Sequence, residues 1–222
     1  YVSPYVGEII ISYEVYAWDL SVRGAHLDQT HGYFNGSCLF LAVEGQEDQS
    51  STLEIHLPKQ HQTWLIATTL DTLPSHQAGV YRYQVANYLT LLDHPVEMGD
   101  FSEVTFTTHN TPHRVVVTGQ HRADLNRLSR DLTRICAAAI NFWGEDAPPF
   151  NQYLFQVMAV GSGYGGLEHR SSTSLLCSRD DLPLTSEPEH KLGDKYKAFL
   201  GLCRHEYFHS WLVKRIQPKV LV

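Results

Sequence analysis

Two histidines and a glutamate near the end of the sequence have the spacing of a metal-binding pair with an acid between them. The segment reads His205-Glu206-Tyr207-Phe208-His209. Residues four apart on a helix stand one turn above each other, so His205 and His209 can direct imidazole nitrogens at one metal ion. Glu206 projects beside them, where its carboxylate can take a proton from a water that attacks a polarised carbonyl. The spacing predicts a zinc ion bound by His205 and His209, with Glu206 as the catalytic base.

The alternative interpretation of this segment is a pair of solvent-facing histidines on a surface helix. Phe199, Leu202 and Trp211 surround the motif with apolar side chains. Such a neighbourhood is typical of a helix that packs against a core. We therefore favour the metal-binding interpretation.

A catalytic zinc needs a third protein ligand and an open position for water. One common arrangement adds a histidine six residues after the second one, but Arg215 occupies that position here. Another takes a glutamate from a later helix, and no Asp or Glu follows Glu206 in this sequence. We therefore expect the third ligand beyond Val222, and we expect this piece alone to bind zinc poorly and to be inactive.

A second constellation, Gly165-Gly166-Leu167-Glu168-His169, lies between two apolar segments. Glycines let a backbone approach a ligand closely, and a carboxylate beside an edge strand can pair with the ammonium group of a substrate. We interpret Gly165, Gly166 and Glu168 as substrate-binding candidates, and His169 as a residue that contacts substrate or orders the carboxylate. The alternative is a hairpin loop with a solvated glutamate.

The hydrophobic pattern divides the chain into an all-β part and an α/β part. Period-two alternation predicts strands at residues 9–17, 38–43, 52–57, 64–69, 81–88 and 103–107. Later segments predict a helix at 122–143, a strand at 153–160, a glycine-rich loop at 161–166, a strand at 172–177 and a last helix at 190–216. Short strands at this spacing suggest a β-sandwich-like domain, so the fold class is α+β with a boundary near residues 111–118.

Composition excludes several classes of protein. The 222 residues carry a formal net charge of −7, which argues against a nucleic-acid binder. No apolar run reaches the roughly 20 residues that span a bilayer, so we expect no membrane partner. The four cysteines are scattered and read as free thiols, which suits the cytosol without fixing the compartment. Because the chain begins at Tyr1 and ends at Val222 in an apolar stretch, we expect it to be an internal piece of a longer polypeptide.

The metal motif and its surroundings resemble the signature of the glycyl aminopeptidase family, zinc metallopeptidases that usually carry a PDZ domain downstream. The similarity extends over nearly the whole sequence. Near the end of the sequence the similarity lies in residues 205–209, Trp211 and residues 213–216. A second similar segment consists of residues 165–169 with Ser171 and Ser172. Two further segments are residues 93–99 and residues 15–36, the latter containing Asp19-Leu20-Ser21-Val22-Arg23. The sequence departs from the family pattern at Leu212, where the family carries Asn.

The resemblance implies a fold like that of aminopeptidase N relatives, with an N-terminal β-domain over residues 1–114 and the start of a thermolysin-like catalytic domain over residues 115–222. It implies that His205 and His209 are zinc ligands, that Glu206 is the base, and that Glu168 anchors the α-amine of the substrate. The family's third zinc ligand and the tyrosine that stabilises its transition state have no counterpart in this sequence. The resemblance therefore implies that the remainder of the same polypeptide is a partner of this piece and supplies these two residues.

The expected activity is the removal of small N-terminal residues, Gly or Ala, from peptides with a free N-terminus. Two alternatives stay open at this point: an endopeptidase of thermolysin type, and an inactive scaffold that binds peptides.

Overall fold

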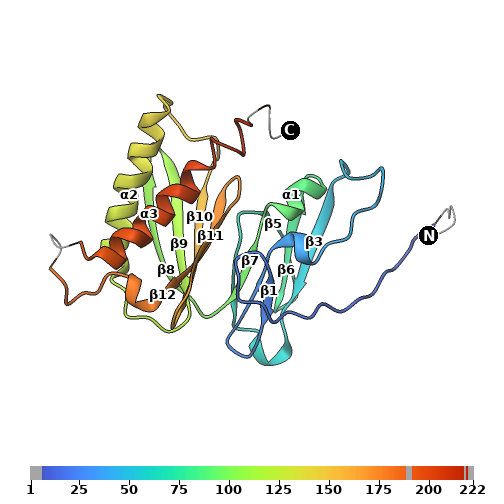
Figure 1. Cartoon of the computed structure of the whole chain (residues 1–222). Helices are drawn as coiled ribbons and strands as arrows, with labels where there is room; N and C mark the ends of the chain where they lie inside the picture. The colour runs from blue at the N-terminus through green and yellow to red at the C-terminus, as the bar shows by residue number, and fades with distance from the viewer. Residues whose placement is uncertain (1–6, 189–191, 218, 220–222) are drawn as a thin grey trace.

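The computed structural model describes residues 7–188, 192–217 and 219, and within them the chain forms two β-rich parts (Figure 1). The first part contains a four-stranded antiparallel sheet and a three-stranded antiparallel sheet. The four-stranded sheet has the order β1-β2-β7-β4, from β1 (Ala25–Leu27), β2 (His31–Phe34), β7 (Val96–Gly99) and β4 (Leu65–Ala67). The other sheet has the order β3-β6-β5, from β3 (Ser51–His56), β6 (Val80–Val85) and β5 (Asp71–Leu73). The short helix α1 (Tyr88–Leu92) leads into β7.

The second part is a five-stranded mixed sheet with two helices against it (Figure 1). The sheet order is β11-β12-β10-β9-β8. The strands are β8 (Ser102–Thr108), β9 (Thr111–Thr118), β10 (Tyr153–Val160), β11 (Tyr164–Glu168) and β12 (Ser172–Ser178). Strand β10 runs parallel to β9 and β12, and the two edge strands are antiparallel to their neighbours. The helices are α2 (Leu125–Phe142) and α3 (Asp194–Phe208).

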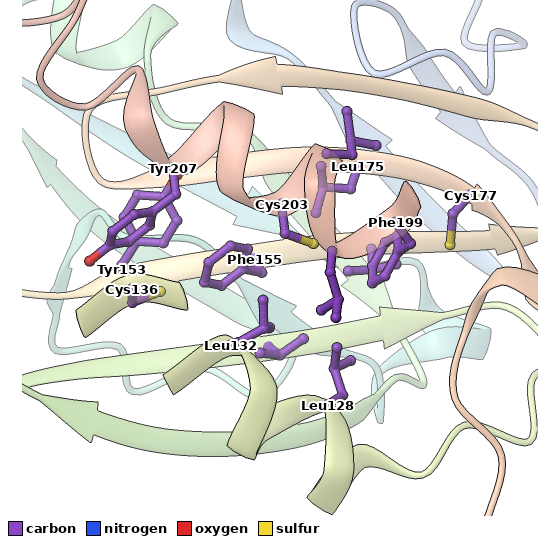
Figure 2. Close-up of a cluster of buried hydrophobic side chains, with 14 of the residues drawn as sticks. Leu128, Leu132, Cys136, Tyr153, Phe155, Leu175, Cys177, Phe199, Cys203 and Tyr207 are labelled. Carbon is purple, nitrogen blue, oxygen red and sulfur yellow. The ribbon is translucent and has the colours of Figure 1, made fainter. Parts of the chain in front are cut away.

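Helix α2 forms where apolar residues recur at three- and four-residue intervals. Asp124 caps its first turn by accepting a hydrogen bond from Arg127 N, and Gly144 ends the segment with a φ of 67°. Its buried face, which includes Leu128 and Leu132, packs with side chains of α3 and the sheet (Figure 2). This contact fixes the place of α3, the helix that carries the metal motif.

The structure confirms the α+β class and most of the predicted elements, with four corrections. Residues 9–17 form no strand: Ile9 and Ile11 are exposed and pair with no described strand, whereas a strand needs a partner for its backbone groups. Contact with β1 begins at Ala17, whose carbonyl accepts from Leu27 N over 3.0 Å. Residues 38–43 form no strand, because Cys38 ends a 3₁₀ turn (Gly36–Cys38) and residues 39–43 are irregular. The glycine-rich stretch is not all loop, because β11 begins at Tyr164.

The fourth correction concerns the last helix, which ends at Phe208 rather than at residue 216. Val213 has a φ of 91°, which is incompatible with a continuing helix. The predicted start at His190 lies outside the described residues. Strand β7 of the four-stranded sheet ends at Gly99, and the next two strands, β8 and β9, belong to the five-stranded sheet.

Two negative expectations can be compared with the described residues. None of the helices there is long and apolar enough to cross a membrane. All four cysteines are free thiols; Cys136, Cys177 and Cys203 are buried, whereas Cys38 is exposed.

A fully buried histidine ties α3 to the sheet. His113 on β9 donates from Nδ1 to the Thr111 carbonyl over 2.9 Å, and its Nε2 accepts from the Tyr207 hydroxyl over 2.9 Å. Burial lowers the pKa of His113 from 6.5 to about 4, against the opposing effect of the hydrogen bond to Thr111. The imidazole is therefore neutral in the folded protein.

We expect His113 to make the folded protein less stable in mild acid. Between pH 6.5 and about 4 the unfolded imidazole binds a proton and the folded one does not. Stability therefore falls with pH in that window, by about 2 kcal/mol between pH 7 and pH 5. Urea unfolding at both pH values measures the total loss, to which His31, His94 and His121 also contribute because burial lowers their pKa, and His113→Gln should remove about 2 kcal/mol of it. An equal loss of stability in the wild type and in His113→Gln would assign the acid sensitivity to other groups.

Candidate active site

The two histidines of the motif face each other at the end of α3. His205 lies in the last turn, and His209 follows as the C-cap with helical backbone angles. Their Nε2 atoms are 3.1 Å apart. Nδ1 of His209 donates to the Leu212 carbonyl over 3.2 Å, so in the tautomer that makes this bond Nε2 is the ring nitrogen with a free lone pair. The carbonyl belongs to the backbone, so the departure from Asn to Leu212 does not remove this contact.

This geometry fits a zinc ion. Zn–N bonds of about 2.0–2.1 Å in a tetrahedron place two ligand nitrogens about 3.3–3.4 Å apart. The observed 3.1 Å between the Nε2 atoms of His205 and His209 is close to that separation. A histidine ligand ordinarily donates its other ring N–H to a fixed acceptor, as His209 does.

Glu206 lies against strand β11 rather than in open solvent. It is 5% exposed, and a Cβ added at Gly166 would lie 2.5 Å from its Cδ and 2.7 Å from its Cγ. The absence of a side chain at Gly166 therefore makes the room that the Glu206 carboxyl occupies. Burial raises the pKa of Glu206 and the nearby Glu168 adds to this rise, while His205 and His209 oppose it.

Glu168 ends β11 beside the metal motif. Ligand atoms of Glu168, Glu206 and His209 all lie within 4.8 Å of one another. The structure thus brings together the two motifs that the sequence singled out separately, as the edge strand β11 passes α3. Gly165 has no heavy atom near the position of a Cβ, so of the two glycines only Gly166 makes a close approach.

His169 is buried, at 3% exposed, and its Nδ1 lies 3.3 Å from Asp93 Oδ1. Asp93 also accepts hydrogen bonds from Lys214 Nζ and Arg170 N. Sequence reasoning missed Asp93 and Lys214 as neighbours of the site. The contact joins residues 121 positions apart, which no local spacing can reveal.

A second group of possible metal ligands, His26, Asp28 and His31, lies on the β1–β2 hairpin. Asp28 Oδ1 already accepts from Thr30 N, Thr30 Oγ1 and His31 N, and its Oδ2 lies 3.2 Å from His26 Nε2. The carboxylate is thus occupied in closing the hairpin turn. His26 and His31 are buried residues of this hairpin, 5% and 2% exposed.

Comparison with known proteins links both ends of the chain to one family. The model of the Peptidase M61 N-terminal domain matches residues 2–100, and the model of M61 glycyl aminopeptidase matches residues 198–222. Together they match more than half of the 222 residues. A search among curated proteins returned no match.

Solved structures with a similar fold include one with clear sequence similarity. An aminopeptidase N family protein from Idiomarina loihiensis is 44% identical, with a TM-score of 0.87 over 93% of this chain and 35% of that one. The chain thus spans about a third of the length of that relative.

Two more distant structures share the fold alone. An M1 zinc metallopeptidase from Deinococcus radiodurans is 15% identical, with a TM-score of 0.51 over 89% of this chain and 43% of that one. Aminopeptidase A from Legionella pneumophila, in complex with aspartic acid, is 14% identical, with a TM-score of 0.55 over 86% and 23%. Two models of this family match residues 2–100 and 198–222, and a 44% identical structure superposes on 93% of this chain, so the chain belongs to the M61 glycyl aminopeptidase family.

Proposed function

We propose that this chain is part of a zinc aminopeptidase that removes small N-terminal residues, Gly or Ala, from peptides. The observation that carries the proposal is the cluster around His209: its Nε2 lies 3.1 Å from Nε2 of His205, and its ligand atom lies within 4.8 Å of carboxylate oxygens of Glu206 and Glu168. Membership of a glycyl aminopeptidase family supports the preference for small residues.

Each group has a distinct task in this proposal. A zinc ion held by His205 and His209 would polarise the scissile carbonyl and lower the pKa of a water to about 7. Glu206 takes the proton of the attacking water and passes it to the nitrogen of the leaving amine. Glu168 pairs with the α-ammonium group of the substrate and thereby sets the distance from the N-terminus to the bond that is cleaved.

The remainder of the polypeptide completes the site in this proposal. The described residues after Glu206 contain no carboxylate that could serve as a third ligand, and the sequence to Val222 contains none either. In this proposal the third zinc ligand and a hydroxyl that stabilises the transition state come from a part of the polypeptide outside these 222 residues, in line with the third of its 44% identical relative that the chain spans. By the same reasoning the piece of 222 residues is expected to be inactive alone.

Hydrolysis of an alanyl anilide by the intact enzyme, compared with its N-acetylated form, tests the proposal. Acetylation removes the ammonium group that Glu168 would bind, so only the free amine should be hydrolysed. Equal rates on both would favour the thermolysin-type endopeptidase. An intact enzyme that holds no stoichiometric zinc and hydrolyses neither compound would favour the scaffold.

A further inference from the structure

The carboxylate of Asp93 contacts both halves of the proposed site from outside them. Lys214 Nζ donates to Asp93 Oδ1 over 2.9 Å, Arg170 N donates to Oδ2 over 3.0 Å, and His169 Nδ1 lies 3.3 Å from Oδ1. Asp93 belongs to the N-terminal β-rich part, where it follows α1 as the C-cap. The other three residues belong to the second part. We call Asp93, His169, Arg170 and Lys214 the Asp93 clasp.

One side of the clasp reaches Glu168. His169 and Arg170 directly follow Glu168, the last residue of β11. His169 N donates to the Ser172 carbonyl across the turn into β12, so the turn is short and its direction is set. Asp93 accepts hydrogen bonds from this turn and thereby holds the end of β11 in place, at the residue that carries the Glu168 carboxylate.

The other side of the clasp reaches His209. Lys214 N donates to the His209 carbonyl over 3.2 Å, within the turn that follows α3. Val213 in this turn has a φ of 91°, a conformation that a β-branched residue rarely adopts and that persists only where neighbouring contacts hold it. The 2.9 Å bond between Lys214 and Asp93 is such a contact, one residue away.

We propose that Asp93 is a positioning residue of the peptidase, which holds the end of β11 and the turn after His209 in one fixed relation. This inference rests on the proposed function. The Asp93 side chain is 13% exposed. Burial would raise its pKa, but the hydrogen bonds from His169 and Lys214 outweigh burial and lower the pKa to about 2. The Asp93 carboxylate is therefore ionised throughout the neutral pH range.

Steady-state kinetics of Asp93→Asn in the intact enzyme test the proposal. Loss of the charge-assisted hydrogen bonds should make the position of Glu168 less well defined and so weaken its binding of the substrate ammonium group. We expect KM for an alanyl anilide to rise about tenfold, with a smaller fall in kcat. Lys214→Met should act in the same direction, and Lys214→Arg, which keeps the ion pair, should retain most of the wild-type KM. The double variant Asp93→Asn/Lys214→Met should be little worse than either single variant, because both remove one interaction.

A matched control comes from the ion pair between Glu103 and Arg114, whose side chains are about one-third exposed. Glu103 lies on β8, at the opposite edge of the sheet from β11. Glu103→Gln should leave KM unchanged. If Asp93→Asn also leaves KM unchanged and lowers kcat only in proportion to its folded fraction, Asp93 is merely structural and the proposal is wrong.

Hydrogen exchange at the Arg170 amide gives a readout that does not depend on activity. This N–H donates to Asp93, so it should exchange faster in Asp93→Ala than in the wild type, and Glu103→Gln should not change it. Unchanged exchange would contradict the clasp even in an active enzyme. Faster exchange in an enzyme that does not hydrolyse the alanyl anilide would support the clasp and reject the proposed function instead.

Discussion

Replacing Glu206 by Gln in the intact enzyme is expected to lower kcat about a thousandfold and to leave zinc bound. Glutamine has nearly the same shape as glutamate but cannot take the proton of the attacking water. The Nε2 atoms of His205 and His209 do not contact the substituted atoms through any described hydrogen bond, so the metal ligands should stay in place. Hydrolysis of an alanyl anilide and zinc content, measured on the same preparation, check both parts.

Glu103→Gln is the matched control for this substitution, because it makes the same chemical change at a partly exposed residue of β8. It should keep wild-type kcat. A Glu206→Gln enzyme that kept about a tenth of its kcat or more would show that Glu206 is not the general base, since general-base catalysis contributes about 10²–10⁴-fold.

Gly166→Ala is expected to lower kcat about a hundredfold without unfolding the protein. The new Cβ would lie 2.5 Å from Glu206 Cδ and 2.7 Å from its Cγ, so either the carboxyl or β11 must move. A misplacement of about 1 Å at a catalytic group costs about 10²-fold. Because β11 is an edge strand and the Gly166 backbone is not in the left-handed region, alanine itself causes no backbone strain there.

The control for this prediction is Gly201→Ala on α3, where a Cβ meets no heavy atom within 4 Å. It should keep wild-type kcat and raise Tm slightly, because glycine inside a helix costs about 1 kcal/mol relative to alanine. Anilide hydrolysis and thermal unfolding of both variants distinguish the effects. Equal kcat in Gly166→Ala and Gly201→Ala would mean that the position of Glu206 against β11 does not matter for the reaction.

Sequence periodicity predicted those elements whose own residues form one buried face. Helix α2 is an example, because its apolar residues repeat with the period of a helix and pack on one core. Strand β10 was predicted differently, as one continuous apolar run, because both of its faces are buried. Residues 9–17 alternate just as clearly but form no strand. Alternation describes one chain segment, whereas strand formation also needs a neighbour, and the segment's own residues do not specify it.

In the candidate site, too, contacts between residues close in the sequence were predicted, and contacts between distant segments were not. The spacing of His205 and His209 predicted that their nitrogens would meet, because four residues make about one helical turn. The contact of Gly166 with Glu206 joins β11 to α3, and the Asp93 clasp joins the two β-rich parts. Neither leaves a periodic pattern in the sequence, so both became visible only when the chain was folded.

The most direct test of the account is anomalous diffraction at the zinc edge from crystals of the intact enzyme. We predict a peak about 2.0–2.1 Å from Nε2 of both His205 and His209, with the Glu206 carboxyl beside it but outside the ligand set. A zinc peak bound elsewhere, or none between the two imidazoles at saturating zinc, would contradict the proposed metal site and the peptidase mechanism built on it.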